Sequence, residues 1–269
     1  LLMGSSYATT EMELAMADRS DRHRLILCND GGTLLGPTMN APIGRDGLAR
    51  LTIDPLLNTQ VDTLYWQLGT DPYRSTPSHR LSDIYSHKTD VGPRWGADQE
   101  SFDSSGSWRI YENARHLIEE GTDPPAVVIE RGHRAGLEVF LSMRVNDIHD
   151  GSLESDDDPL LSPMKRAHPE WLLGQASKRA AGEEVEESRD ERPQYSGVSR
   201  FAYNFAVPEV REYKLALARE AISNYDLDGL DWDFCRFPRL FLAGEAEKNA
   251  DSLTEMIRSL RESLDVKGR

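Results

Sequence analysis

Four short segments of the chain have the pattern of buried β-strands. Each is dominated by aliphatic, aromatic or β-branched residues and closes at a Gly, Pro, Asn or Asp, which commonly terminate strands. The segments are residues 24–29, 61–68, 137–145 and 230–237. We therefore predict four strands, each buried in a sheet.

Segments with helical spacing of apolar residues lie between and after these strands. The clearest is 208–225, where Pro208 can occupy the first helical turn. Its apolar stripe consists of Val210, Tyr213, Leu217, Ala221 and Ile222. Further helical segments are expected at 48–57, 111–120, 126–135 and 250–264. Strands that alternate with helices predict βαβ units and a parallel sheet, an α/β fold.

Two long connections follow the second and third predicted strands, at residues 70–110 and 146–207. In parallel α/β sheets the chemistry collects in the loops after the carboxyl ends of the strands. Both connections are rich in aromatic and polar residues, which suit the apolar faces and hydroxyl rims of sugars. Residues 1–21 are interpreted as a poorly ordered N-terminal extension and residues 22–269 as the βα units.

The number of βα units matters more than the length of 269 residues. A (β/α)8 TIM barrel typically has about 250 residues, but it needs eight units to close. Only four units are visible here. We therefore predict a TIM-barrel type fold of which the chain holds the N-terminal half. The missing half would come from further sequence or from another chain, including a homo-oligomer.

Composition narrows the classes of partner. The formal net charge is −15, with 31 Lys and Arg against 46 Asp and Glu, so a polyanion such as nucleic acid is not expected to bind. No apolar run reaches the roughly 18 residues of a membrane helix, so no membrane partner is expected. Cys28 and Cys235 are predicted to be buried free thiols. No metal or cofactor motif is present, so we expect neither. The compartment is not indicated.

The segment 225–238 contains the strongest candidates for catalysis. Side chains two apart on a strand share a face, so Asp231 and Asp233 point the same way, while Trp232 and Arg236 point the other way. Two carboxylates on one buried face are costly unless they are paired or functional. Asp233, nearer the strand end, is expected to contact substrate. Asp231 is expected to orient it or an arginine, although a purely structural acid–arginine network is the alternative.

A second group of polar residues lies at the end of the third predicted strand. Arg144 and Asn146 share a face there, and Asp147 and His149 follow. An arginine beside carboxylates balances their charge and can hold a substrate oxygen. Asp147 is a candidate second acid, and His149 is a candidate acid, base or hydrogen-bonding residue. Asn146 is also a candidate for substrate binding. Further candidates are Asp30, at the end of the first strand, Trp66, Trp171, Tyr203 and Arg236.

Four motifs together resemble the uncharacterised "family 10-like" glycosyl hydrolases of bacteria, over roughly residues 22–265. They are Arg144-x-Asn-Asp147 with His149, His168-Pro-Glu-Trp171, Pro208-Glu-Val-Arg-Glu212, and Tyr225-Asp-x-Asp-Gly-Leu-Asp-x-Asp-Phe-x-Arg-Phe-Pro238. The resemblance implies a carbohydrate-active TIM barrel with its active site at the strand carboxyl ends.

The expected function is hydrolysis of a glycosidic bond in a poly- or oligosaccharide by two carboxylic acids. Asp233 is the first candidate, and Asp147, Asp231 or a residue outside the chain is the second. Two alternatives stay open: a carbohydrate-binding barrel without turnover, and a non-hydrolytic sugar enzyme such as an isomerase or lyase.

Overall fold

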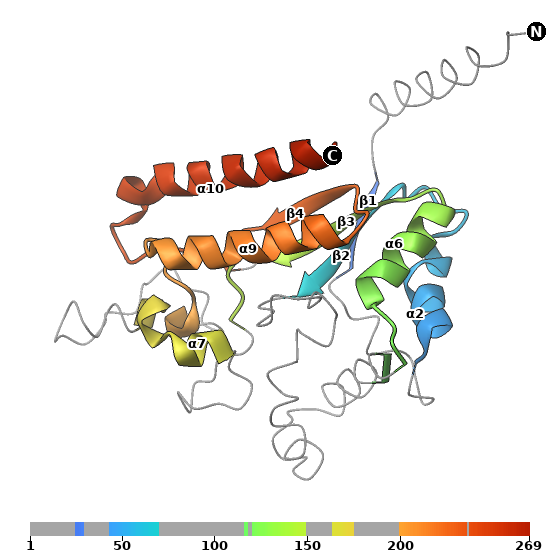
Figure 1. Cartoon of the computed structure of the whole chain (residues 1–269), viewed down its shortest axis with the longest axis horizontal. Coiled ribbons are helices and arrows are strands. Elements are labelled where there is room, and N and C mark those ends of the chain that lie inside the picture. Colours follow the sequence, from blue (N-terminus) through green and yellow to red (C-terminus); the bar gives the residue numbers. More distant parts are fainter. Residues whose placement is uncertain are drawn as a thin grey trace, which may run out of the picture.

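Four parallel strands form the sheet on which the chain is built. The computed structural model describes residues 25–29, 43–69, 116–117, 120–148, 163–174, 199–235 and 237–269. The strands β1 (Ile26–Asn29), β2 (Thr63–Gly69), β3 (Glu138–Arg144) and β4 (Gly229–Asp233) lie side by side in chain order (Figure 1). All neighbouring pairs are parallel. The predicted α/β arrangement, a parallel sheet whose strands alternate with helices, is confirmed.

Four longer helices pack against this sheet. They are α2 (Arg45–Thr52), α6 (Pro124–Arg134), α9 (Pro208–Asn224) and α10 (Ala246–Lys267). The prediction started α6 two residues late, because prolines were taken to interrupt it. Pro124 and Pro125 instead form its first turn, where no backbone N–H is needed. At the other end of the chain, Gly268 ends α10 in the left-handed conformation, with φ 78°.

Short helical elements occupy part of the connection that was predicted to be loop. These are α7 (Pro163–Ala167) and the 3₁₀ turns η5 (Pro169–Trp171) and η7 (Ser199–Phe201). A further 3₁₀ turn, η2 (Asp54–Leu56), follows α2. The fourth strand is shorter than predicted and ends at Asp233. The predicted extension 1–21, the connection 70–110 and most of the predicted helix 111–120 lie outside the described residues.

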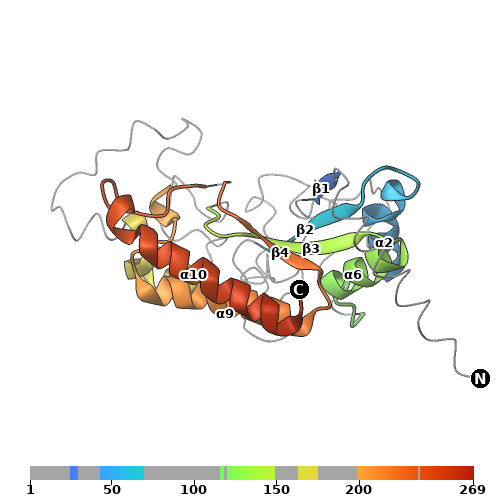
Figure 2. The same ribbon diagram turned by 90° about the horizontal axis from the view of Figure 1, so that it is seen from above.

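The two faces of the sheet have different environments. One face is covered by the four longer helices, which lie on one side of the sheet (Figure 2). Its side chains are fully buried: Leu64, Trp66, Leu68, Val139, Leu141 and Met143. The helix α6 comes so close that a Cβ on Gly132 would lie 2.4 Å from Val139 Cγ2. This helix-covered face holds the core.

The opposite face of the sheet, which we call the open face, is only partly buried. Tyr65 and Phe140 are half-buried there, with ring centroids 5.0 Å apart. The Phe140 ring lies over the backbone of Gly229, where a Cβ would be 2.1 Å from Phe140 Cε1. On β1, Ile26 and Leu27 point to opposite faces and both are exposed, so this outermost strand is covered on neither side.

The prediction of two buried thiols is wrong in one respect. Cys28 and Cys235 are free, as expected, but both are exposed. Cys28 lies on the poorly covered strand β1, and Cys235 lies beyond the early end of β4. The apolar residues around each cysteine suggested burial, but the position of the strand in the sheet decides it.

Candidate functional site

The two acidic residues of β4 lie on the open face, at the carboxyl end of the sheet. Asp231 is in register with Ser142 of β3, and Asp233 is in register with Arg144. Neighbouring residues in register share a face and lie close enough for their side chains to interact. The register therefore places two carboxyl groups beside a hydroxyl and a guanidinium.

The carboxyl group of Asp231 is held by the neighbouring strand. Ser142 Oγ donates a hydrogen bond to Asp231 Oδ2 over 2.6 Å. Burial raises the pKa of Asp231 above its ordinary value and the charge of Asp233 raises it further, while the bond from Ser142 opposes the rise. Asp231 is thus shifted towards its protonated form.

Asp233 is fixed by the chain that follows it. Its Oδ1 accepts a hydrogen bond from the backbone N–H of Cys235 over 2.7 Å. Its carbonyl oxygen accepts the N–H of Val145 over 3.0 Å, which ties the end of β4 to the end of β3. This local bond between a side chain and the backbone stops the strand at Asp233 and holds the carboxylate at the sheet edge.

The Cys28 thiol on β1 is affected by both acids of β4. Burial raises the pKa of the Cys28 thiol, and the charges of Asp231 and Asp233 raise it further. Cys28 is on β1, which is the edge strand at the other end of the sheet from β4. The negative potential of the two aspartates therefore extends over the open face.

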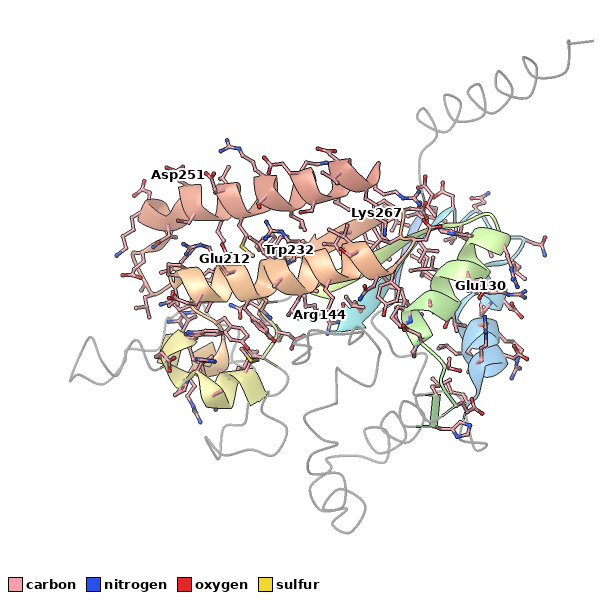
Figure 3. The ribbon with its side chains drawn as sticks, viewed as in Figure 1. Glu130, Arg144, Glu212, Trp232, Asp251 and Lys267 are labelled. Carbon is pink, nitrogen blue, oxygen red and sulfur yellow. The ribbon has the colours of Figure 1, made fainter. Side chains whose placement is uncertain are left out.

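Arg144 connects the acids of β4 to the residues that follow β3. Its Nη1 lies 3.3 Å from Asp147 Oδ2, and the Asp147 side chain is only 2% exposed. The Nζ of Lys165, on α7, donates to the Asp147 carbonyl over 2.8 Å. Figure 3 shows Arg144 at the carboxyl end of the sheet, far from Lys267 at the end of α10. Asp147 is therefore placed to orient Arg144.

Asn146 joins three segments around this end of the sheet. Its Nδ2 donates to the carbonyls of Tyr203 and Arg239 over 3.0 and 2.9 Å, and its Oδ1 accepts the Tyr203 N–H over 2.8 Å. The side chain is buried with its hydrogen-bonding atoms occupied. Asn146 thus builds the wall of the site, and its predicted substrate-binding role stays a prediction.

Two aromatic residues that were predicted to contact the substrate are buried. Trp66 is fully buried on the helix-covered face, on the other side of the sheet from the acids. Tyr203 is fully buried between two buried lysines, with Lys165 Nζ 5.3 Å and Lys214 Nζ 4.6 Å from its ring centroid. Both rings support the structure and neither is placed to stack on a sugar.

Trp171 is half-buried in η5. His168 stacks on its ring with centroids 3.9 Å apart, and the same His168 pairs with Glu170. The N–H of Asn204 donates to the Trp171 carbonyl over 2.7 Å, so this segment lies beside the one that carries Tyr203. The remaining candidates, Asp30, His149 and Arg236, lie outside the described residues.

Ser142 is a site residue that the sequence analysis missed. It is a hydroxyl residue between the apolar residues Leu141 and Met143 of β3. That pattern marks it as a polar residue on the same face as Arg144, two positions on. The register with Asp231 was the missing information, because strand pairing is not encoded in one segment alone.

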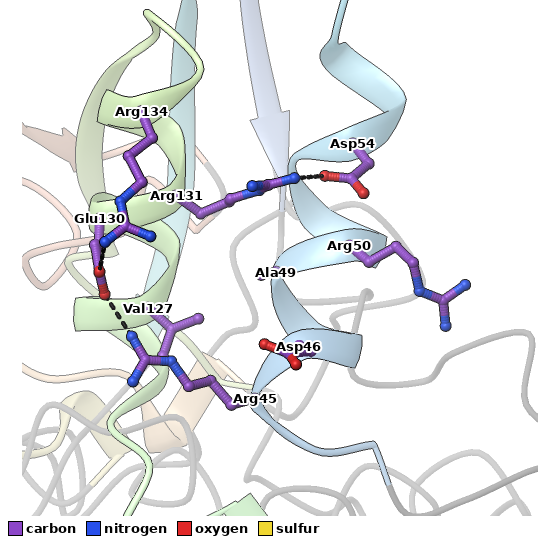
Figure 4. Close-up of a pocket in the computed structure, with 9 residues that line it drawn as sticks. All are labelled: Arg45, Asp46, Ala49, Arg50, Asp54, Val127, Glu130, Arg131 and Arg134. Carbon is purple, nitrogen blue, oxygen red and sulfur yellow. Dashed lines mark hydrogen bonds and ion pairs between the residues drawn. The ribbon is translucent and has the colours of Figure 1, made fainter.

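A groove of about 330 Å³ between α2 and α6 is a different kind of feature (Figure 4). Arg45 and Arg134 both pair with Glu130, and Arg131 pairs with Asp54. The side chains are well exposed, 56% for Arg45 and 41% for Glu130. Exposed pairs of this kind contribute at most about 1 kcal/mol each. The groove is best explained as helix-to-helix ion pairing in the outer layer.

Metal binding and membrane insertion are two further properties of the described part of the chain. Among these residues, no group of three or more His, Cys, Asp or Glu side chains is placed to hold a metal ion. No helix within the same ranges combines the length and the apolar character needed to cross a membrane.

The described geometry thus gathers Asp231, Asp233, Arg144 and Ser142 on the open face, with Asp147 behind the arginine. Two carboxyl groups on one face, one of them with a raised pKa, can together donate and accept protons. No model of a known protein family matches the chain, and no curated protein matches it.

Proposed function

We propose that the chain is a glycoside hydrolase of poly- or oligosaccharides, with Asp231 and Asp233 as its acid pair. The observation that supports this most is the placement of both carboxyl groups on the open face at the carboxyl end of β4. The four longer helices of the described ranges lie on the other face, and parallel α/β enzymes bind their substrates at this end of the sheet. The neighbouring Arg144 supplies a cation that can hold a substrate oxygen.

We also propose that this sheet is half of a TIM-type barrel. The strands follow chain order, all are parallel, and the four longer helices that the structure describes cover one face, as in the wall of such a barrel. Within the described residues, β1 and β4 each pair on one side only. A second set of strands, from further sequence or another chain, would pair with these edges and cover Ile26 and Leu27.

In the proposed reaction water is added across a glycosidic C–O bond. One carboxyl group gives its proton to the leaving oxygen, while the other acts as a nucleophile or removes a proton from the attacking water. Arg144, oriented by Asp147, holds a substrate oxygen in place. Asn146 keeps the surrounding segments against the end of β3.

The test is hydrolysis of a panel of polysaccharides, such as xylan, β-glucan, chitin and pullulan, followed by the appearance of new reducing ends. Loss of a general acid or base typically costs about 10²–10⁴ in rate, so Asp233→Asn is expected to lose activity by that factor. The matched control is Asp251→Asn, because Asp251 is an exposed carboxylate on α10 (Figure 3). Its activity should equal that of the wild type.

Equal activity of Asp233→Asn and wild type would contradict the assignment. Binding of the same polysaccharides without new reducing ends would favour a carbohydrate-binding protein. Conversion of a sugar without addition of water would favour an isomerase or lyase. The barrel proposal is tested separately by light scattering, where a stable, active monomer of this chain with both sheet edges unpaired would contradict it.

A further inference from the structure

The two aspartates of β4 differ in the kind of hydrogen-bond partner that each one has. Asp233 accepts a backbone N–H, from Cys235, and a backbone N–H can only donate. Such a bond stabilises a carboxylate in its charged form. Asp231 instead faces the hydroxyl of Ser142, which can donate or accept. Asp231 is therefore the member of the pair whose partner tolerates a proton.

The bond from Ser142 also distinguishes the two oxygens of Asp231. Ser142 Oγ contacts Oδ2 over 2.6 Å. Oδ1 of Asp231 accepts no hydrogen bond in the part of the chain that is described. Because Ser142 is buried and in register on β3, its backbone cannot drift away from Asp231. The carboxyl group is thus turned so that Oδ1 is left for a ligand.

We propose that Asp231 holds the proton of the pair on Oδ1, that Asp233 holds the charge, and that Ser142 is the positioning residue that occupies Oδ2 of Asp231 and so leaves Oδ1 for the proton. The inference rests on the proposed function for its chemical meaning: Asp231 becomes the donor to the leaving oxygen. The proton state itself is a property of the free protein and can be measured without a substrate.

The surroundings of Asp231 on the open face fit this division. The titratable or charged side chains that share the face are Cys28 on β1, Tyr65 on β2, Glu138 and Arg144 on β3, and Asp233 on β4. Burial raises the pKa of Asp231, and so does the charge of Asp233, while Ser142 lowers it. Removing Ser142 and removing the Asp233 charge are therefore expected to move the titration of Asp231 in opposite directions.

The experiment follows the carboxyl carbons of selectively labelled aspartates by ¹³C NMR as the pH is changed. The Asp231 signal is assigned by its loss in Asp231→Asn. In the wild type it should titrate above the ordinary aspartate value of about 3.9. Ser142→Ala should raise the midpoint, Asp233→Asn should lower it, and Ser142→Thr, which keeps a hydroxyl, should leave it close to the wild-type value.

A purely structural role for Ser142 would change the stability of the protein but not this midpoint. The proposal is overturned if Ser142→Ala leaves the Asp231 midpoint in place, or if Asp233→Asn raises it. Unfolding curves of each variant establish that the folded protein is being titrated. If the midpoints move as expected but no polysaccharide is hydrolysed, the proton division holds and the proposed hydrolase activity fails.

Discussion

The helix-covered face and the open face of the sheet are made by the same four strands, yet they serve different ends. On the covered face, consecutive inward positions are apolar and fully buried, as in Leu64, Trp66 and Leu68. On the open face, the positions near the carboxyl ends of β3 and β4 carry Ser142, Asp231 and Asp233. The two aspartates repel each other when both are charged. Alternation along a strand lets one face stabilise the fold while the other accepts an arrangement that stability alone would not select.

The largest expected effect is a loss of stability on the covered face. It is compared with the loss at the neighbouring residue, whose side chain lies on the open face. Trp66→Ala should lower the free energy of unfolding by about 3–5 kcal/mol, because it empties a fully buried site under the helices. Tyr65→Ala removes a half-buried ring on the open face and should cost less than half as much. Urea unfolding followed by circular dichroism measures both.

A conservative variant sharpens this comparison. Trp66 Nε1 is buried without a hydrogen-bond partner in the described structure. Trp66→Phe removes that unsatisfied group, whose burial costs about 1–3 kcal/mol, and should therefore cost far less than Trp66→Ala. Equal losses for Tyr65→Ala and Trp66→Ala would mean that the open face is packed as tightly as the covered one.

A loss of stability of intermediate size is expected when a Cβ is added at either of two glycines. Gly132 lies against the covered face, and Gly229 lies under a ring on the open face. A Cβ at Gly132 would meet Val139, which is enclosed between α6 and the sheet. Overpacking of such a site costs about 1–3 kcal/mol. A Cβ at Gly229 would meet Phe140 even more closely, but this half-buried ring can turn into the open side. Gly132→Ala should therefore destabilise the protein more than Gly229→Ala.

Double-mutant cycles test this explanation. Val139→Ala should recover part of the loss in Gly132→Ala, since it removes the methyl group that the new Cβ meets. Phe140→Ala should change little in the Gly229→Ala background. A larger loss for Gly229→Ala than for Gly132→Ala would show that the Phe140 ring is locked in place.

Local sequence patterns predicted the elements better than the site. Apolar runs closed by turn residues identified all four strands, and the stripe from Val210 to Ile222 identified α9, because these signals lie within one segment. The pair Asp231 and Asp233 also followed from alternation on one strand. Ser142 could not be found in this way, since its role depends on register between strands that are far apart in sequence.

Burial was the other property that the sequence did not predict. Asn146, Trp66 and Tyr203 have side chains suited to binding sugars, but the fold uses all three internally. Asn146 is occupied by backbone groups of segments some 57 and 93 residues away along the chain. Cys28 shows the opposite case. Its apolar neighbours in the sequence predicted burial, but it lies on an edge strand and is exposed. Residue type indicates what a side chain can do, and only the fold decides what it touches.

The smallest expected effect is a gain in stability on the open face. Because the pKa of Asp231 is raised in the folded protein, the unfolded chain loses this proton at a lower pH than the folded chain does. Stability from this group is therefore complete below about pH 4, the ordinary range of aspartate, and falls as the pH rises through the folded value. Asp231→Asn removes the group whose ionisation the folded protein disfavours, so it should be more stable than wild type at pH 7.5, by less than about 1 kcal/mol.

The same variant should lose this advantage at about pH 3, where Asp231 is mostly neutral in both states. Urea unfolding of wild type and Asp231→Asn at about pH 3 and at pH 7.5 measures the change, with Asp251→Asn as the control for a charge removed from an exposed helix. A difference that does not grow with pH would mean that Asp231 is not strained by burial and by Asp233. A gain that does grow with pH would identify Asp231 as a residue retained against stability, which is the signature expected of a group kept for chemistry.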